Sequence, residues 1–339
     1  MRILVTGSAG FMGSHLVDYL SGEHEVWGLD DLSLGSLVNV NEKARRRFLK
    51  VDLGDRQAVV GAVNKVRPEI VYHLAAWAHE GLSQFAPILI TENNYNAFLN
   101  LVVPLIKCKV KRVVVCSSMA VYGEQDPPFD EIMPRRPADI YGVAKAAMED
   151  AVRILSDVHG FEYVVIRPHN VYGPRQNLAD PYRNVVAIFI NRMLMGKPFY
   201  IYGDGEQTRA FSYIDDVVPP LARSGLISGV AGEVFNIGPD REYSVNQLAF
   251  EVLDAFGRRG DGRYEPVYLP DRPSEVKYAY CTSGKAERRL GFKETVSLKE
   301  GVRRMVEWAR GVGYQEPKYL TDLELGGEMV PKTWKKRLI

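Results

Sequence analysis

Short apolar runs rich in β-branched residues alternate with segments of helical periodicity over the first half of the chain. The runs that predict strands are RILVTG (2–7), EVWGLDD (25–31), RFLKVDL (47–53), IVYHLAA (70–76), RVVVCSS (112–118) and YVVIRP (163–168). Apolar residues recur at helical spacing near 11–20, 55–66, 92–108 and 142–157. This alternation predicts an α/β fold, with a doubly wound parallel sheet covered by helices on both faces.

Length, charge and cysteine usage narrow the function classes. The chain has 339 residues, more than one ordinary core holds, so two lobes are expected. The 43 Lys and Arg residues nearly balance the 42 Asp and Glu residues, so the chain has no large net positive charge that would attract nucleic acid or an anionic membrane. No apolar run has the length of a membrane span, and the chain opens on a strand rather than a signal peptide. Cys108, Cys116 and Cys281 show neither paired nor metal-binding spacing, so we expect a reduced, cytoplasmic protein without a metal site.

A glycine-rich turn joins the first predicted strand to the first predicted helix. Gly7, Gly10 and Gly13 would let a pyrophosphate approach the backbone N–H groups at the helix start. On the glycines alone, a flavodoxin-like fold with a tight turn stays open. Asp30 ends the second strand, where a carboxylate accepts hydrogen bonds from a ribose diol and repels a 2′-phosphate, which favours NAD over NADP.

Further candidates stand where the predicted strands end. Ligands gather at the carboxyl ends of parallel strands. The residues at or near these ends are Asp52, Ala75–Ala76, Asn94, Ser117–Ser118 and Pro168–His169.

Tyr141 and Lys145 stand four residues apart, on one face of a predicted helix. An ammonium beside a phenol favours the phenolate, so the tyrosine could act as a base near neutral pH. The motif alone is more commonly a helix surface pair. The position of the pair favours a catalytic role, because its helix follows the strand that carries Ser117–Ser118.

Fixed cations and donors in the second half form a candidate diphosphate site. Asn170, Arg209 and Arg272 lie in separate polar segments. Two arginines can clamp a diphosphate with forked hydrogen bonds, although each alone is more commonly a solvated surface residue.

Taken together, these motifs resemble the extended short-chain dehydrogenase/reductase family, and within it the nucleotide-sugar epimerases and dehydratases, with a pattern closest to the UDP-galactose 4-epimerase group. The matching segments, over about 1–310, are TGSAGFMGSHL, DDL, VDLGD, HLAA, CSSMAVYG, YGVAK, RPHNVYGPRQN and GDGEQTRAFSYIDD. The resemblance implies a Rossmann-type NAD domain at 1–168 plus about 212–240, and a smaller mixed α/β nucleotide-sugar domain at about 169–211 and 241–311. Residues 312–339 lie outside it, as an extension on the surface or at a subunit contact. It also implies a homodimer built on the helices at 92–108 and 142–157.

The resemblance assigns roles to particular residues. Ser118, Tyr141 and Lys145 match the catalytic residues. The residues expected to bind NAD are Gly7, Gly10, Phe11, Met12, Gly13, Asp30, Asp31, Asp52, Leu53, Leu74, Ala75, Ala76, Asn94, Cys116, Ser117, Tyr141, Lys145 and Pro168. Those expected to bind a UDP-sugar are Ser118, Asn170, Asn184, Tyr202, Arg209, Arg272 and Ala279, together with His79 and His169, which differ from the residues that the family usually carries there.

Met119 and Ala120 favour one reaction over its neighbours. They stand where the family's dehydratases carry an acidic pair, and neither side chain can serve the acid–base chemistry of water elimination. We therefore expect an NAD-dependent 4-epimerase of UDP-glucose and UDP-galactose. Small Ala279 indicates that N-acetylated forms are accepted too. His79 and Glu80 depart from the epimerase pattern. They leave open a 4,6-dehydratase or a 4-reductase. A non-catalytic NAD-sensing protein, as another class, stays open because a fold does not determine function.

Overall fold

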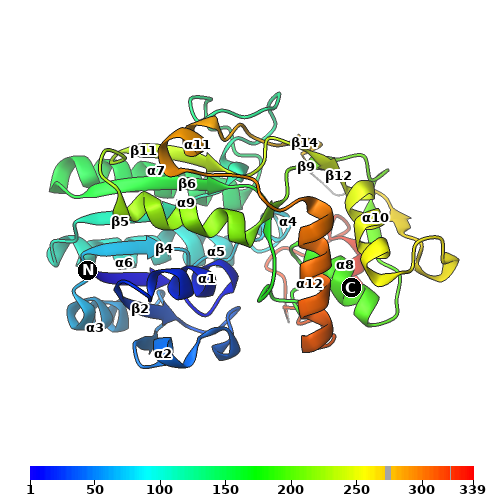
Figure 1. Ribbon diagram of the computed structural model, residues 1–339, viewed down its shortest axis with the longest axis horizontal. Helices are drawn as coiled ribbons and strands as arrows, with labels where there is room; N and C mark the ends of the chain where they lie inside the picture. The colour runs from blue at the N-terminus through cyan, green and yellow to red at the C-terminus, as the bar shows by residue number, and fades with distance from the viewer. Residues whose placement is uncertain (272–275, 321) are drawn as a thin grey trace.

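A computed structural model describes residues 1–271, 276–320 and 322–339 of the protein (Figure 1). Its centre is a parallel sheet with the strand order β11-β6-β5-β4-β1-β2-β3. The strands are β1 (Arg2–Thr6), β2 (Glu25–Asp30), β3 (Phe48–Lys50), β4 (Ile70–His73), β5 (Arg112–Cys116), β6 (Glu162–Pro168) and β11 (Glu233–Ile237). Ile3 of β1 pairs with Val26 of β2 and with Ile70 of β4, so the strand order reverses at β1. A ligand crevice forms at such a reversal.

Helices cover both faces of this sheet (Figure 1). On one face, α1 (Phe11–Leu20) and α9 (Ile214–Leu226) bury apolar residues against Val114 of β5. On the other face, α3 (Arg56–Val66), α6 (Ala97–Lys107) and α7 (Ile140–His159) pack against Val113 and Val115. Because side chains alternate along a strand, a continuous run of valines feeds both cores. The predicted α/β sheet is confirmed.

The helix predicted at 92–108 is longer and less regular than expected. It starts as α5 (Pro87–Thr91), passes through a π-helical turn (Glu92–Asn96) and continues as α6. The short helix α2 (Glu42–Arg45) lies in the connection between β2 and β3, and the short helix α4 (Glu80–Ser83) lies in the loop that follows β4. A π turn adds a residue to the helical repeat and therefore rotates the face that each side chain occupies.

A smaller lobe follows β6 along the chain. Its helices are α8 (Val185–Leu194), α10 (Val245–Phe256) and α12 (Leu298–Val312). Short strands form two small pairs, β8 (Tyr200–Tyr202) with β13 (Val267–Leu269) and β7 (Val171–Tyr172) with β10 (Ser212–Tyr213). In a third small sheet, β9 (Thr208–Arg209) lies between β12 (Tyr243–Ser244) and β14 (Tyr278–Ala279). The last described helix before α12, α11 (Gly284–Leu290), packs on α9 and β11 and so lies with the large sheet.

The residues after α12 fold back and end beside α8 (Figure 1). We call this segment, the described residues from 313 onward, the C-terminal extension; it contains the short helix α13 (Lys332–Lys335). The Lys318 N–H donates to the Ala179 carbonyl at 2.7 Å, and the Gln315 N–H donates to the Asn191 side chain at 2.9 Å. Val330 and Trp334 are buried with Leu82, Phe85 and Ala86. The extension therefore packs in a hydrophobic cluster that it shares with the segment at 82–86.

Among the described residues, none of the helices combines the length and apolar character needed to cross a bilayer.

Candidate functional site

A cavity of about 420 Å³ opens at the carboxyl ends of the sheet strands. Gly7, Asp30, Leu74, Cys116 and Pro168, which end or follow five of the strands, all line it. Its opposite wall comes from the smaller lobe and includes Asn184, Tyr202 and Arg209. The topology therefore places one ligand site between the sheet and the smaller lobe.

The turn between β1 and α1 admits only glycine at two positions. Gly7 has φ +68°, and a Cβ there would lie 2.8 Å from the Ala75 nitrogen. A Cβ on Gly13 would lie 2.0 Å from the Gly7 carbonyl oxygen. Helix α1 begins after its N-cap residue, Gly10, which has no side chain to accept a hydrogen bond. The first N–H groups of the helix therefore lack a side-chain cap. These features suit a pyrophosphate at the helix start.

Asp30 lies at the end of β2 and shapes the loop beside this turn. Its carboxylate accepts hydrogen bonds from the Ala9 N–H at 3.0 Å and the Leu32 N–H at 2.8 Å. Burial raises the pKa of Asp30, and these backbone hydrogen bonds oppose that shift. Asp30 and Asp31 both line the cavity, as expected for residues facing the adenosine ribose of a dinucleotide.

Removing the Asp30 charge should weaken discrimination between NAD and NADP. Asp30→Asn keeps one oxygen, which can accept from either the Ala9 or the Leu32 N–H but not both, since these bond to different carboxylate oxygens, and it ends the repulsion of a 2′-phosphate. We expect the NAD-over-NADP affinity ratio to fall about tenfold or more. Titration of both cofactors measures it, with Asp31→Asn as the control that should change the ratio less. Equal affinity of the unmodified protein for both cofactors would contradict the role of Asp30.

Ser118, Tyr141 and Lys145 are buried and line the same cavity. Ser118 follows β5, and its hydroxyl accepts from the Ala120 N–H at 3.1 Å and is hydrogen-bonded to Tyr141. Tyr141 lies in the first turn of α7, which begins where the Asp139 carboxylate accepts from the Gly142 N–H at 2.7 Å. The Lys145 ammonium lies one turn on, 5.6 Å from the centre of the Tyr141 ring. The structure thus brings the three predicted catalytic residues together.

The electrostatics around Tyr141 differ from the simple expectation. Burial raises the pKa of the phenol, the nearby Arg183 guanidinium opposes that shift, and Glu80 adds to it. Burial also lowers the pKa of Lys145 to about 8, and its ammonium donates to the Cys116 carbonyl at 2.8 Å. Arg183 therefore joins the predicted Tyr141–Lys145 pair as a cation that favours the phenolate.

Most of the remaining predicted cofactor residues line the cavity. Those found there are Phe11, Met12, Asp52, Leu53, Ala75, Ala76 and Ser117, in addition to the residues described above. Asn94 does not line it, contrary to expectation. Its amide donates to the Trp77 carbonyl at 3.0 Å and the Ile90 carbonyl at 2.8 Å, while Asn93 faces the cavity. The π-helical turn explains the difference, because it changes which side chain points outward.

The predicted substrate residues divide into several groups. His79, Asn170, Asn184, Tyr202 and Arg209 line the main cavity. Several of these side chains also hold the lobe together. The Asn184 amide donates to the Val171 carbonyl at 3.1 Å, and the Arg209 guanidinium donates to the Val276 carbonyl at 2.6 Å.

Three predicted substrate residues are placed differently. His169 does not line the cavity: it is fully buried, and burial lowers its pKa to about 3. It packs beneath Gly238, where a Cβ would lie 2.6 Å from the imidazole ring. Ala279 lines a side pocket of about 100 Å³ instead. Arg272 lies outside the described residues.

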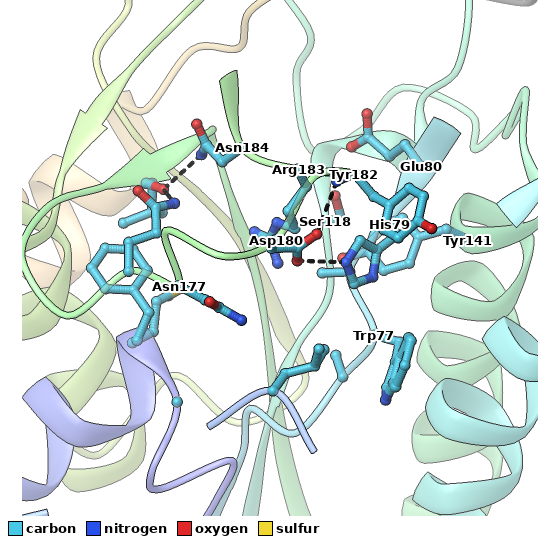
Figure 2. Close-up of a pocket in the computed structure, with 18 of the residues that line it drawn as sticks. Trp77, His79, Glu80, Ser118, Tyr141, Asn177, Asp180, Tyr182, Arg183 and Asn184 are labelled. Atoms are coloured by element: carbon cyan, nitrogen blue, oxygen red, sulfur yellow. Dashed lines mark hydrogen bonds and ion pairs between the residues drawn. The ribbon is translucent and has the colours of Figure 1, made fainter. Parts of the chain in front are cut away.

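His79, Asp180 and Arg183 line the cavity together with Tyr141, and the sequence patterns did not indicate that these side chains lie close together. His79 Nε2 lies 2.7 Å from the Asp180 carboxylate, and this contact joins the loop after β4 to the segment before α8 (Figure 2). Arg183 and Tyr182 follow in the same segment. The only sequence signal was the polar stretch DPYRN between RPHNVYGPRQN and the apolar helix α8. Nothing in that stretch indicated that it pairs with His79.

The side pocket adjoins the main cavity. Both are lined by Met119, Asn170, Arg209, Glu80 and Trp334. Ala120, Asp139 and Ala279 line the side pocket. Burial and the neighbouring Glu80 raise the pKa of Asp139 to about 7.

Comparison with known proteins places the chain in a wider group. Residues 3–238 match the model of the NAD dependent epimerase/dehydratase family. The chain is 37% identical to a putative UDP-glucose 4-epimerase of Methanocaldococcus jannaschii, over 91% of this chain and 98% of that one. It is 32% identical to the human dTDP-D-glucose 4,6-dehydratase, over 91% of this chain and 90% of that one. A crystal structure of the Thermotoga maritima UDP-glucose 4-epimerase with UDP-glucose superposes with a TM-score of 0.86, at 37% identity, covering 92% of this chain and 99% of that one.

Proposed function

Because the chain belongs to the NAD dependent epimerase/dehydratase family, we propose that it is an NAD-dependent 4-epimerase of UDP-hexoses. Its substrates are UDP-glucose and UDP-galactose, together with their N-acetylated forms. The observation that carries this proposal is that Ser118, Tyr141 and Lys145 share one cavity with the glycine turn and Asp30.

Residues 1–168 with about 212–240 hold the cofactor in this proposal, while about 169–211 and 241–311 hold the nucleotide sugar. The turn at Gly7 and Gly13 supports a pyrophosphate at the start of α1. Asn170 and Arg209 line the opposite side of the cavity and suit the substrate's diphosphate.

The protein's part in the reaction is to move one proton and to orient the sugar. Tyr141 takes the proton from the 4-hydroxyl, and Ser118 hydrogen-bonds the same oxygen. NAD, when bound, supplies reversible hydride chemistry at C4. Lys145 donates to the Cys116 carbonyl at the strand end and would hold the nicotinamide ribose of bound NAD. The 4-keto sugar turns about its diphosphate link and presents its other face, after which Tyr141 returns the proton to the new hydroxyl. No net redox change occurs.

The product of a defined substrate panel tests the function. Purified protein with NAD is incubated with UDP-glucose, UDP-galactose, UDP-GlcNAc and UDP-GalNAc, and the products are identified by NMR. We expect interconversion at C4 without net NADH formation. In a parallel reaction with NADH in place of NAD, consumption of NADH would indicate a reductase. Absence of turnover on the whole panel would contradict the proposal.

A 4,6-dehydratase is the second candidate. Glu80 and Asp139 line the side pocket beside Met119 and Ala120, so carboxyl groups approach the reacting end from another segment. A carboxyl whose pKa lies near 7, as burial and Glu80 make that of Asp139, can serve general acid–base chemistry. The same NMR experiment separates the two reactions, because a dehydratase yields a 4-keto-6-deoxy sugar with loss of water.

The volume of the side pocket predicts the breadth of sugar specificity. A phenol ring at position 279 would occupy space that an acetamido group needs, and overpacking of this kind costs roughly 1–3 kcal/mol. Ala279→Tyr should therefore reduce kcat/KM for the N-acetyl substrates by about 10–100-fold and leave the plain hexoses nearly unchanged. Tyr278→Ala is the control, because half-exposed Tyr278 lines neither cavity. Rejection of both N-acetyl substrates by the unmodified protein, or equal losses for all four substrates, would show that the pocket is wrongly assigned.

The proposed enzyme is a homodimer. Val143, Ile154 and Val158 form an exposed apolar stripe along α7, which a two-fold contact through this helix would cover. Light scattering should give twice the chain mass of 38.1 kDa. A mass that stays at one chain over a range of concentrations would rule this assembly out.

Its compartment is the cytoplasm in this proposal. All three cysteines are free thiols, which suits a reducing environment.

A further inference from the structure

Trp334 of the C-terminal extension stands between the two cavities. It is 6% exposed and lines both the main cavity and the side pocket. Pro331 of the same segment lines the side pocket, and Ile339 lines the main cavity. The extension therefore supplies part of the wall of the proposed substrate site.

The structure holds Trp334 firmly in this position. Its indole packs edge-on against Phe85, at 5.9 Å between ring centres, and against Tyr182, at 5.0 Å. The neighbouring Thr333 hydroxyl is hydrogen-bonded to the Tyr202 hydroxyl. Aromatic edge-to-face pairs and a buried hydroxyl contact fix a ring more tightly than surface packing does.

Other contacts tie the extension to segments that carry proposed substrate residues. The Leu320 N–H donates to the Tyr182 hydroxyl at 2.9 Å. Glu324 accepts the first N–H groups of α5, from Ile88 and Leu89, at 2.7 Å each. Arg192 of α8 donates to the Leu338 carbonyl. The segment that follows His79, the segment at Asp180–Asn184 and helix α8 are thus all joined through the extension.

We propose that the C-terminal extension completes the sugar subsite, with Trp334 as a specificity-determining residue whose ring packs against the hexose and bounds the room for its substituent. This inference rests on the proposed function and deepens it. Trp334 shares the side pocket with Met119, Ala120 and Ala279, next to Ser118, which places it at the sugar rather than at the nucleotide base. The apolar face of a hexose pairs well with an indole, since aromatic walls with a few polar groups are what ligand pockets provide.

The extension is about as long as the part of this chain that the alignments with the relatives described above leave out. Those relatives are matched over 90–99% of their own length, whereas 8–9% of this chain is left outside those alignments. A wall built from this segment changes which sugars fit without altering the residues that perform the chemistry.

Trp334→Ala tests this inference, with Val330→Ala as the matched control. Val330 is buried in the same cluster as Trp334 but lines neither cavity. We expect Trp334→Ala to raise KM for UDP-hexoses by about 10–100-fold, the effect of losing one buried aromatic contact, with kcat and NAD affinity nearly unchanged. Trp334→Phe, which retains a ring, should restore most of the affinity, and Val330→Ala should leave KM unchanged. Equal effects of Trp334→Ala and Val330→Ala would overturn the inference, because they would reflect the stability of the extension alone.

Calorimetry separates this inference from the proposed reaction. Binding of UDP-glucose and of UDP is measured for the unmodified protein and for Trp334→Ala. We expect Trp334→Ala to lose UDP-glucose affinity and to retain UDP affinity. This result would support the sugar contact even if the unmodified protein showed no epimerase turnover. Equal losses for UDP and UDP-glucose, or no loss for either, would contradict it.

Discussion

Replacing Tyr141 with phenylalanine is expected to lower kcat by about 10²–10⁴-fold, the usual contribution of a positioned acid–base group. The phenol is the buried side chain that approaches Ser118, and its hydroxyl is the atom that would exchange a proton with the sugar. Phenylalanine fills the same space in α7, so the fold should be unaffected. Steady-state turnover of UDP-galactose with NAD present measures the effect.

Binding measurements show whether the loss of kcat in Tyr141→Phe comes from the proton-transfer step rather than from weaker ligand binding. The affinities of Tyr141→Phe for NAD and for UDP-glucose should stay close to those of the unmodified protein, because its backbone and ring are retained. Arg153→Ala, at an exposed position of the same helix, is the matched control and should keep full activity. If Tyr141→Phe turns over at nearly the original rate, Tyr141 is not the base.

Removal of the Glu149 carboxylate should cost about 3–5 kcal/mol of the free energy of unfolding. Glu149 is buried on α7 and accepts hydrogen bonds from Arg167 at 2.6 and 2.9 Å and from the Ser117 hydroxyl at 2.5 Å. Arg167 in turn donates to the Tyr122 hydroxyl at 2.7 Å. In Glu149→Ala the buried guanidinium loses its counter-charge, and this uncompensated charge accounts for the cost.

The neighbouring residue offers a direct control for this network. Asp150 pairs with Arg135 at 2.6 Å, but its side chain is 46% exposed, so Asp150→Ala should cost less than about 1 kcal/mol. Denaturant unfolding of both variants measures the difference. The double variant Glu149→Leu/Arg167→Met should recover much of the loss, because it removes both buried charges. Similar stabilities of Glu149→Ala and Asp150→Ala would show that the buried pair contributes little.

The same network links stability to the site. Ser117 precedes Ser118 at the end of β5, and Glu149 lies one helical turn beyond Lys145 on α7. The Glu149–Ser117 hydrogen bond therefore joins the strand end to the helix that carries Tyr141. Its partners are distributed over β5, α7 and β6, and no pattern in any one of these segments indicated the contact.

Some features of the site follow from short stretches of sequence. The glycine turn was predictable because its backbone leaves no room for a Cβ at Gly7 and Gly13, which is a local requirement. The sheet was predictable because buried parallel strands need continuous apolar runs, as in RVVVC. Tyr141 and Lys145 were placed correctly because a regular helix fixes the relation between residues four apart.

Other features were decided only by the packing of distant segments. Asn94 turned inward because a π-helical turn altered the helical repeat, and His169 lies beneath Gly238 instead of in the cavity. The His79–Asp180 pair, the approach of Arg183 to Tyr141 and the position of Trp334 each join residues far apart in the chain. The sequence by itself determined the sheet, the glycine turn and the Tyr141–Lys145 helix, because backbone sterics and hydrophobic periodicity act over a few residues. The tertiary structure alone decided which charges and rings surround the reacting end, because those contacts depend on how the smaller lobe and the C-terminal extension fold back over the sheet.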